Sequence, residues 1–364
     1  MLHHLVFLRA KMCEWPVYAP PPGVDSELMR RSNPENADAH IWLGRQYLKK
    51  GDFDKGASEI GWMWHQRAPE LVDQKGLFID EAGRPIRQDG RTVVLSADSG
   101  LGDTLQFVRY ARALKELGAR VVVECQSEFV RLIRNTAEID EVVAVGQLSD
   151  GEDLRVPLHN LMSAFRSTTP DSIPNAVPYV RPHDEETDSW RQRVAPLPGL
   201  RVGLCWSGNL RHQRNRSRSI PVGQMSSLFE LPGVSWISLQ KDSDVAVPAL
   251  LDWSAEFVDL AATAALVQNL DLVITVDSAV AHLAGALGRP VWLLNRLDSC
   301  WRWMEGRTDS PWYPTLTQFR QRRAGDWSDV LPEVAASLTT LTGERKKSAA
   351  RPRRRSRAAV PAVA

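Results

Sequence analysis

Residues 270–290 form the stretch that most constrains the fold of this chain. The segment 270–276 is almost wholly apolar and carries β-branched residues at positions 273–276, a pattern typical of a parallel strand that is buried on both faces. Asp277 or Ser278 can cap a following helix. Gly288 and Pro290 then end that helix before a second apolar segment at 291–294, so the sequence predicts a β-α-β unit.

In a β-α-β unit the helix begins at the carboxyl edge of the sheet. Free backbone N–H groups and the helix dipole favour an anion at that point, commonly a phosphate. The alternative is a β-α-β unit with a purely structural role, and the pattern of this segment alone leaves both interpretations open.

The composition excludes several classes of protein. With 364 residues, of which 43% are hydrophobic and 24% charged, the chain has the size of a soluble globular protein with two domains and a smaller appendage. No apolar run reaches the roughly 18 residues that cross a bilayer, and Met1–Trp15 lacks the features of a signal peptide, so we expect a cytoplasmic protein without a transmembrane segment. The four cysteines are scattered without CxxC spacing, which predicts neither disulfides nor zinc.

Basic residues gather at the C-terminus. Residues 345–364 carry eight Lys and Arg residues and no acidic residue, although the whole chain has a net charge of only +1. This composition predicts a disordered, solvated extension over residues 342–364, with contact to nucleic acid or anionic lipid as the alternative. The rest of the chain is net acidic, which argues against nucleic acid as the main partner.

Residues 36–75 have the pattern of two helices joined by a turn. The segment 43–47, followed by Gly51 and Phe53, is similar to part of one tetratricopeptide repeat. The likeness is degenerate, because His40 stands where the repeat usually has Trp. One helical pair cannot bury its apolar face alone, so we expect it to pack against the next domain.

A second strand-to-helix turn opens that next domain. Residues 92–96 are predicted to form a strand and residues 106–117 a helix that ends before Gly118. Between them, Gly100 and Gly102 allow the backbone to pass close to a ligand, and Asp103 lies at or just inside the start of the helix. The carboxylate of Asp103 should therefore face the edge of the sheet.

Strands and helices continue to alternate along the chain. Further strands are predicted at 121–125, 141–145, 154–158, 201–206 and 235–240, and helices at 128–135, 222–230 and 261–268. A Pro-rich stretch at 170–182 predicts a linker between two lobes. The predicted organisation is a poorly ordered N-terminus at 1–35, the helical pair at 36–75, a Rossmann-like lobe at 76–180, a second at 181–341, and the tail at 342–364.

Five motifs, taken in order, carry a resemblance to a known family. They are residues 100–107, 206–209, 218–219, 276–282 and 309–314. Over about residues 36–341 the chain resembles bacterial tetratricopeptide-repeat proteins with a glycosyltransferase family 9 domain, which is similar to the heptosyltransferases of lipopolysaccharide synthesis. The resemblance implies a GT-B fold of two Rossmann-like domains facing a cleft, a nucleotide-sugar donor held mainly by the second domain, inversion at the anomeric carbon, and no cofactor or obligatory metal.

The resemblance also implies a role for Asp103. As the acid that follows the Gly-rich loop, it matches the proposed general base, which removes the proton of an acceptor hydroxyl while that oxygen attacks the sugar C1. The alternative is that the same carboxylate only caps the helix.

The implied donor site draws small, hydroxyl, amide and basic residues from several loops. These residues are Gly100, Gly102, Ser207, Gly208, Asn209, Arg216, Arg218, Ser219, Gln240, Lys241, Asp277, Ser278, Ala279 and His282. Ser278 and neighbouring backbone N–H groups would stabilise the leaving diphosphate, and His282, one helical turn later, would reach a phosphate. The alternatives are a packed histidine at 282 and solvated surface charges for the arginines and Lys241.

Other features complete the sequence interpretation. An aromatic and basic cluster is predicted to serve structural packing rather than stacking on a sugar or base; it comprises Trp301, Arg302, Trp303, Trp312, Tyr313 and Arg320. The segment 242–244 imitates a metal-binding DxD motif, and we interpret that match as chance. Asp98-Ser99 and Asn215 depart from the family pattern, which puts the choice of donor or acceptor in doubt.

Two other functions are compatible with the sequence. An NAD(P)-dependent oxidoreductase would use the Gly-rich loop and Glu124 as its ribose-binding acid, but Leu105 stands where the third glycine belongs. A glycosyltransferase-like protein without turnover would use the helical pair for binding or assembly. The sequence identifies neither the donor sugar and its base nor the acceptor, which is a glycan, a lipid or a protein.

Overall fold

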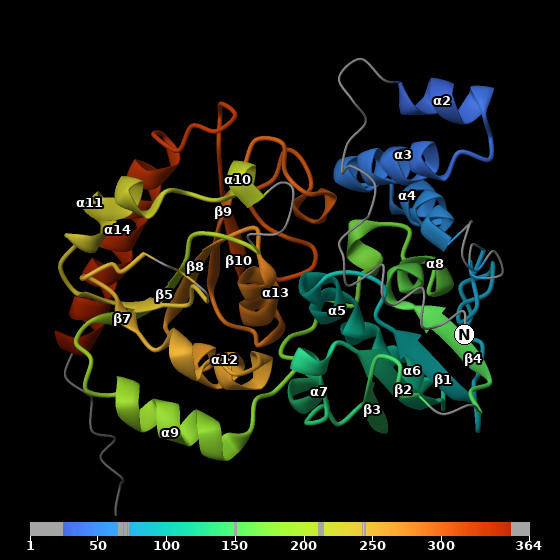
Figure 1. Cartoon of the computed structure of the whole chain (residues 1–364), viewed down its shortest axis with the longest axis horizontal. Helices are drawn as coiled ribbons and strands as arrows, with labels where there is room; N and C mark the ends of the chain where they lie inside the picture. The colour runs from blue at the N-terminus through green and yellow to red at the C-terminus, as the bar shows by residue number, and fades with distance from the viewer. Residues whose placement is uncertain are drawn as a thin grey trace, which may run out of the picture.

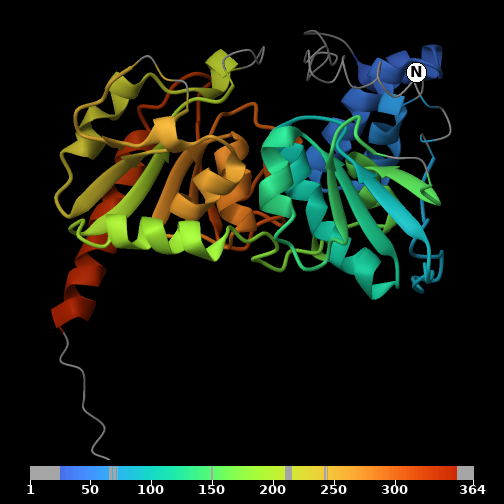
Figure 2. The ribbon, with the colours of Figure 1, turned by 60° about the horizontal axis from the view of Figure 1, so that its bottom comes forward.

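Two parallel sheets, each with helices packed on it, lie side by side in the molecule (Figures 1 and 2). The structure is a computed structural model that describes residues 25–64, 68, 71, 73–148, 151–209, 215–241, 243 and 245–350. We call the part around the sheet nearer the N-terminus the first lobe and the part around the other sheet the second lobe. The predicted α/β class with two Rossmann-like lobes is confirmed.

The first lobe has a four-stranded sheet with the order β3-β2-β1-β4. Its strands are β1 (Thr92–Ser96), β2 (Arg120–Cys125), β3 (Glu141–Ala144) and β4 (Leu154–Pro157). Its helical segments are α5 (Leu101–Phe107), η3 (Val108–Tyr110), α6 (Ala111–Glu116), α7 (Ser127–Ile133), η4 (Leu158–Asn160) and α8 (Leu161–Ala164). The connection to the second lobe begins with η5 (Pro170–Ser172).

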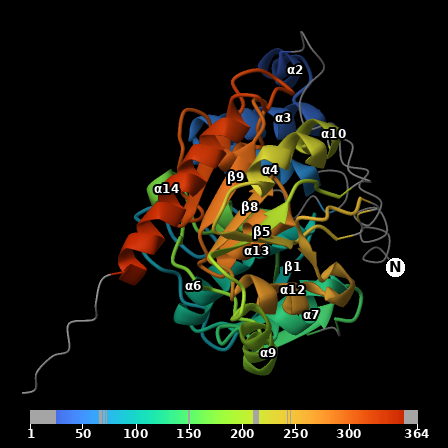
Figure 3. The ribbon, with the colours of Figure 1, turned by 90° about the vertical axis from the view of Figure 1, so that its left-hand side faces the viewer.

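The second lobe has a six-stranded sheet with the order β10-β9-β8-β5-β6-β7. Its strands are β5 (Leu200–Cys205), β6 (Val234–Ser238), β7 (Leu251–Asp252), β8 (Leu272–Val276), β9 (Val291–Asn295) and β10 (Leu316–Arg320). Its helical segments are α9 (Asp184–Val194), α10 (Asn215–Arg218), η6 (Val222–Met225), α11 (Ser226–Phe229), η7 (Ser254–Glu256), α12 (Leu260–Val267), α13 (Ala279–Ala286), η8 (Trp301–Trp303) and α14 (Val330–Ala350). Helix α14 lies on the side of this lobe away from the first lobe (Figures 1 and 3).

The β-α-β unit predicted from residues 270–290 is confirmed as β8, α13 and β9. All five residues of β8 are buried, which explains why the strand is apolar without alternation. Ser278 is the N-cap of α13, and its side chain accepts a hydrogen bond from the backbone N–H of Val280 at 3.3 Å. Gly288, with a φ of +69°, turns the chain toward β9, which pairs in parallel with β8.

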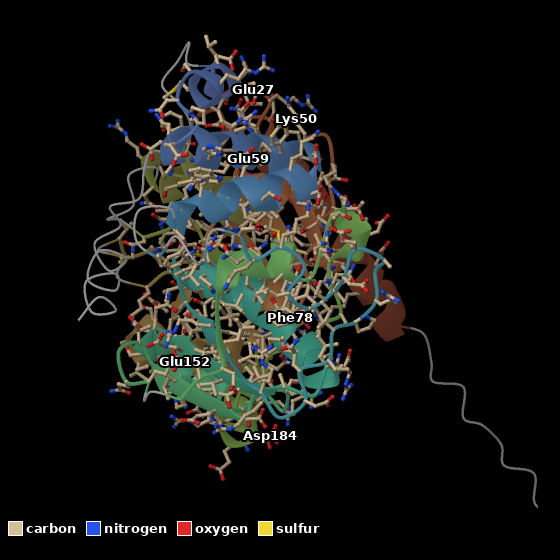
Figure 4. All side chains as sticks on the ribbon, turned by 90° about the vertical axis from the view of Figure 1, so that its right-hand side faces the viewer. Glu27, Lys50, Glu59, Phe78, Glu152 and Asp184 are labelled. Atoms are coloured by element: carbon tan, nitrogen blue, oxygen red, sulfur yellow. The ribbon has the colours of Figure 1, made fainter. Side chains whose placement is uncertain are left out.

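The N-terminal helices are α2 (Ser26–Ser32), α3 (Ala37–Lys50), α4 (Phe53–Ile60) and the short η1 (Gly61–Trp64). We call α3, α4 and η1 the helical pair. Gly51, with a φ of +91°, ends α3, and Asp52 caps α4, so the predicted pair of helices is confirmed as a structure. In Figure 4 the pair, marked by Lys50 and Glu59, lies at one end of the molecule, with Phe78 between it and the region of Glu152.

One hydrophobic core joins the helical pair to both lobes. It contains Phe53 and Ile60 from the pair, Leu95 and Phe107 from the first lobe, and Trp312 from the second lobe. Helix α5 packs against α13 and α7 against α12 across the boundary between the lobes. A separate core of the second lobe lies between its sheet and α14 and includes Leu204, Ile274 and Val334.

Several predicted boundaries are wrong. The helix expected at 106–117 begins earlier, at Leu101, and consists of α5, η3 and α6. Residues 1–24 lie outside the described part, but 26–32 form a helix capped by Asp25. Helix α14 continues past the predicted start of the tail at 342 as far as Ala350, and residues 351–364 lie outside the described part. No helix in the described ranges combines the length and the apolar character needed to cross a membrane.

Candidate functional site

The candidate site lies where the strand order reverses in each sheet, at the carboxyl ends of the strands. In the first lobe this point lies between β1 and β4, and in the second between β5 and β8. Parallel α/β sheets bind ligands at such points, because the two adjoining loops run in opposite directions and leave space between them. The Gly-rich loop at 100–102 follows β1, and the loops that begin at Ser207 and Asp277 follow β5 and β8.

Asp103 lies in the first turn of α5, as predicted. Its Oδ2 accepts a hydrogen bond from the backbone N–H of Gly100 at 2.8 Å, so the carboxylate caps the helix. Its Oδ1 is paired with the guanidinium of Arg302, which comes from η8 of the second lobe. The Nε2 of His159, on η4, lies 3.7 Å from the same oxygen.

These neighbours keep the carboxylate of Asp103 ionised. Burial by itself raises the pKa of Asp103, but the charge of Arg302 above all, then the contacts with His159 and His282 and the hydrogen bond from Gly100, outweigh burial and hold the pKa below its usual value. Both interpretations of Asp103 from the sequence are thus compatible with the geometry, because one carboxylate oxygen caps the helix and the other faces the second lobe.

His282 is buried at the contact between α5 and α13. Its Nδ1 lies 2.8 Å from the hydroxyl of Tyr313, and its ring lies 5.0 Å from that of Trp303. Burial, together with the nearby charge of Arg302, lowers the pKa of His282 to about 4, so the imidazole is neutral at pH 7. The structure therefore places His282 in a packed position and does not support a cationic phosphate ligand there.

Asp277 precedes α13 and is tied to the aromatic cluster. Its Oδ1 accepts a hydrogen bond from the indole N–H of Trp303 at 2.8 Å. Burial raises the pKa of Asp277. The charges of Arg218 and Arg296 and the hydrogen bond from Trp303 lower the pKa by a larger amount, so the net shift is downward. Two arginines thus lie near the start of α13, where the helix dipole also favours an anion.

A polar cluster follows β5 and β6. Ser207 donates its backbone N–H to the Oε1 of Gln240 at 2.9 Å, and its hydroxyl lies 2.9 Å from that of Ser219. The amide of Asn215 donates to the hydroxyl of Ser207 at 3.1 Å. The residue that departs from the family pattern at 215 therefore helps to hold the hydroxyl groups together.

Gly208 allows Arg218 to approach the chain. A Cβ atom at position 208 would lie 2.3 Å from the Nη2 of Arg218, so glycine leaves room for the guanidinium in its present position. Ser278, which caps α13, lies beside the same cluster, because its Oγ is 3.8 Å from the Sγ of Cys205. The structure thus brings together the following predicted donor residues: Ser207, Gly208, Arg218, Ser219, Gln240, Asp277, Ser278 and Ala279.

Other predicted donor residues are not drawn into this cluster. The side chains of Asn209, Arg216 and Lys241 are exposed, although the backbone carbonyl of Lys241 accepts a bond from Gln240 at 3.3 Å. Residues 210–214, which include Arg211, His212 and Arg214, lie outside the described residues, as do Asp242 and Asp244 of the DxD-like segment. No group of three or more His, Cys, Asp or Glu in the described ranges is placed to hold a metal ion.

The aromatic cluster confirms the packing prediction only in part. Trp303, Trp312 and Tyr313 are fully buried, as packing requires. Arg302 also pairs with Asp103, a contact that the packing prediction did not include. The contact of Arg302 with Asp103 could be predicted only from the knowledge that η8 lies over α5. Local sequence patterns do not contain this information.

Sequence reasoning also missed His159 and Arg296, and it named Asp98 only as a departure from the family pattern. Asp98 follows β1 and His159 follows β4, so both lie at the point where the first sheet reverses its order. Arg296 follows β9, is buried, and donates to the hydroxyl of Ser217 at 2.8 Å. Their signal in the sequence was similar in each case, namely a polar residue within two positions of the end of a predicted strand.

The acid proposed for an oxidoreductase has other partners. The carboxylate of Glu124 accepts a hydrogen bond from the backbone N–H of Gly146 at 3.0 Å and one from Arg155 at 2.8 Å. Both of its oxygens are therefore engaged within the first lobe. This arrangement weighs against the hydroxyls of a ribose as its partner.

Comparison with known proteins agrees with this geometry. Residues 257–305, which span α12, β8, α13, β9 and η8, match the profile of the family described as glycosyltransferase family 9 (heptosyltransferase). The chain is also 25% identical over 288 residues to protein FlbA of Caulobacter vibrioides, and the match covers 71% of this chain and 47% of that protein. The chain thus spans about half the length of this relative.

Two solved structures share the two-lobe architecture. The glycosyl transferase family 9 protein of Veillonella parvula is 12% identical, with a TM-score of 0.52, over 73% of this chain and 97% of that one. The ADP-heptose lps heptosyltransferase II of E. coli is 12% identical, with a TM-score of 0.50, over 70% of this chain and 99% of that one. The fold of this chain is that of the GT-B heptosyltransferase structures, and a stretch of its second lobe, residues 257–305, carries the sequence pattern of glycosyltransferase family 9.

Proposed function

We propose that this protein is a glycosyltransferase that transfers a sugar from a nucleotide-sugar donor to an acceptor hydroxyl. The observation that carries this proposal is the contact made by η8 with two carboxylates. Arg302 pairs with Asp103 of the first lobe, and the adjacent Trp303 donates to Asp277 at the start of α13. One turn of chain thus links the candidate base to the candidate donor site.

Asp103 is suited to act as the general base. Because its pKa lies below the usual value, the carboxylate is ionised at neutral pH and can accept a proton. Each carboxylate oxygen has more than one acceptor direction, so an acceptor hydroxyl can approach while Gly100 still donates to Oδ2. Removal of the hydroxyl proton as the oxygen attacks the sugar C1, from the face opposite the leaving group, inverts the anomeric configuration.

The leaving nucleoside diphosphate requires stabilisation of its negative charge. The N-terminus of α13, the guanidinium of Arg218 and the hydroxyls of Ser207 and Ser219 supply dipoles and donors at one edge of the sheet. These groups provide stabilisation of the leaving group without a metal, which is the metal-independent mechanism that we propose.

The remaining parts of the proposal rest on resemblance. The E. coli structure described above acts, by its title, on ADP-heptose, so an ADP-linked sugar is the first donor to test. A bacterial origin, a cytoplasmic location and a tetratricopeptide ancestry for the helical pair belong to the same proposal. The acceptor is a hydroxyl of a glycan, a lipid or a protein.

A nucleotide screen tests the proposal. The melting temperature of the full chain is measured with UDP, GDP, ADP and CMP and with their sugar conjugates, because a ligand of the native state raises the melting temperature. We expect one nucleoside diphosphate to stabilise the chain and its sugar conjugate to be consumed in the presence of an acceptor, with an inverted anomeric signal by NMR. Stabilisation by NAD or NADP in place of every nucleoside diphosphate would favour the oxidoreductase.

A further inference from the structure

Arg302 is a buried cation of the second lobe that contacts three polar side chains of the first lobe. Its Nε donates to the Oε1 of Gln106 at 2.6 Å, and its Nη2 pairs with Asp103. The same Nη2 lies 3.2 Å from the Nε2 of His159. The guanidinium also lies over the ring of Trp301, 4.3 Å from its centroid. Trp301 therefore packs on the face of the guanidinium, while residues of the first lobe bind its nitrogen atoms.

His159 is held in one tautomer by Asp98. The carboxylate of Asp98 accepts a hydrogen bond from the backbone N–H of His159 at 3.1 Å, and its other oxygen lies 2.8 Å from the Nδ1 of the ring. A carboxylate oxygen can only accept, so Nδ1 carries a proton in this contact. The side chain of Asp98 is 0% exposed, so water does not compete with His159 for its carboxylate.

The lone pair of His159 faces Arg302. The guanidinium nitrogen Nη2 can only donate, so Nε2 accepts one of its N–H groups, and the other N–H bonds to Asp103. The order of contacts is therefore Asp98, His159, Arg302, Asp103, and it runs from the buried end of the first lobe to the candidate base.

We propose that Arg302 is a positioning residue for Asp103, supplied by the second lobe and held in place by the Asp98–His159 pair. Arg302 fixes the orientation of the carboxylate toward the second lobe and keeps it ionised, and the contact of Nη2 with the Nε2 of His159 prevents the guanidinium from turning away. This inference rests on the proposed function, because it assigns a purpose to Arg302 only if Asp103 is the base.

The charges around Asp103 support this assignment. The titratable groups that face it are Arg302 from η8, His159 from η4 and His282 from α13. Asp98 lies behind His159, and Asp277 lies near His282. Among the groups that lower the pKa of Asp103 the charge of Arg302 has the largest effect, and His282 is neutral at pH 7 because its pKa is about 4.

The loop that carries Arg302 is anchored at two places, by Asp277 and by Lys49. Trp303 donates to Asp277 at 2.8 Å. The backbone N–H of Glu305 donates to the carbonyl of Lys49 in the helical pair at 3.0 Å, and the ammonium of Lys49 lies 3.1 Å from the carboxylate of Glu305. The loop is thus held both to the start of α13 and to the helical pair, and these contacts fix the position of Arg302 over Asp103.

An NMR titration of the full chain tests the proposal without turnover. Aspartate labelled with ¹³C at Cγ is titrated in the native chain, and the signal that is absent from Asp103→Asn is assigned to Asp103. In Arg302→Met we expect the titration midpoint of Asp103 to rise by about one pH unit or more. Arg302→Lys should restore part of the shift, because the charge returns without the planar fork of donors.

His159→Asn gives a second and more selective variant. An asparagine amide can still donate to Asp98 from near the position of Nδ1, but it has no group at the position of Nε2. We expect a smaller rise of the Asp103 midpoint in the same direction. Arg307→Met is the matched control, because Arg307 lies in the same segment and pairs with Asp309; this change should leave the midpoint unchanged.

The outcomes separate this proposal from the proposed function. If the midpoint is the same in the native chain, Arg302→Met and His159→Asn, the proposal is wrong, whatever the activity. If the midpoint rises but no nucleotide sugar is consumed by the native chain, the proposed function fails, and with it the catalytic purpose of Arg302. With a donor in hand, the acid limb of the kcat/KM profile should move to higher pH in Arg302→Met by the same amount as the NMR midpoint.

Discussion

Gly102 on α5 leaves space for the imidazole of His282 on α13. A Cβ atom built at position 102 would lie 2.7 Å from the Cδ2 atom of His282 and 3.1 Å from its Nε2. The ring cannot easily withdraw, because Tyr313 bonds to its Nδ1 and Trp303 packs against it. The absence of a side chain at one position of the Gly-rich loop thus sets how closely the two lobes approach.

Gly102→Ala should therefore destabilise the contact between the lobes. We expect a loss of about 1–3 kcal/mol in the free energy of unfolding, the usual cost of an added methyl group in a packed region. Chemical denaturation measures this loss. Gly223→Ala is the control, because no atom lies within 4 Å of the corresponding Cβ; a loss of equal size in both variants would contradict this account of Gly102.

The buried, neutral His282 should make stability depend on pH. Its pKa is about 4 in the folded chain and 6.5 for the free side chain, so below pH 6.5 the unfolded chain binds a proton that the folded chain excludes. The free energy of unfolding should then fall by about 2 kcal/mol between pH 7.5 and pH 5 through this residue. In His282→Asn the fall over this range should be smaller by that amount, measured by denaturation at each pH. An unchanged slope would show that His282 is not excluded from protonation.

Arg218 should contribute to binding of the donor diphosphate. Arg218→Met removes a charge-assisted hydrogen-bond donor next to the start of α13, and the affinity for the stabilising nucleotide should fall by roughly tenfold to a hundredfold. Titration calorimetry at two salt concentrations measures this effect. Arg216→Met should have a smaller effect because Arg216 is exposed, and Arg323→Met, in an exposed ion pair with Asp326, serves as the control. Equal affinity in Arg218→Met and Arg323→Met would remove Arg218 from the site.

The helical pair should unfold together with the lobes. Phe53 begins α4, is 0% exposed, and meets the ring of Trp312 of the second lobe edge-on at 6.1 Å between centroids. Phe53→Ala should cost about 3–5 kcal/mol of stability because it leaves a cavity in the shared core. Calorimetry should show a single transition that moves to lower temperature. A separate early transition, with the main one unmoved, would mean that the pair is an independent unit.

The sequence was sufficient to predict the repeating units of the fold. The β-branched run at 273–276, the cap at Ser278 and the stop at Gly288 each act through neighbouring residues, and the structure has the elements in the expected places. The predicted start of α5 was wrong by several residues. Gly100 begins the helix without a side-chain cap, and its own backbone N–H donates to the carboxylate of Asp103 in the first turn.

The contacts across the lobes could not be predicted in the same way. Arg302 and Asp103 are far apart in the chain, and nothing local to η8 distinguishes an arginine that packs from one that pairs with a carboxylate. The sequence left the role of His282 open between a packed histidine and a phosphate ligand for the same reason, since its neutrality follows from burial between α5 and α13. Local patterns predict elements, whereas the charge state of a side chain depends on which elements meet.

The most direct test of the central claim compares the native chain with Asp103→Asn. An asparagine oxygen can still accept the bond from Gly100, but the amide cannot take the proton of an acceptor hydroxyl. With the nucleotide sugar identified in the screen, we predict that Asp103→Asn binds the nucleotide within about twofold of the native affinity and transfers sugar about 10²–10⁴-fold more slowly. Transfer at the native rate by a folded Asp103→Asn chain would contradict the account, because the carboxylate would then serve only to cap α5.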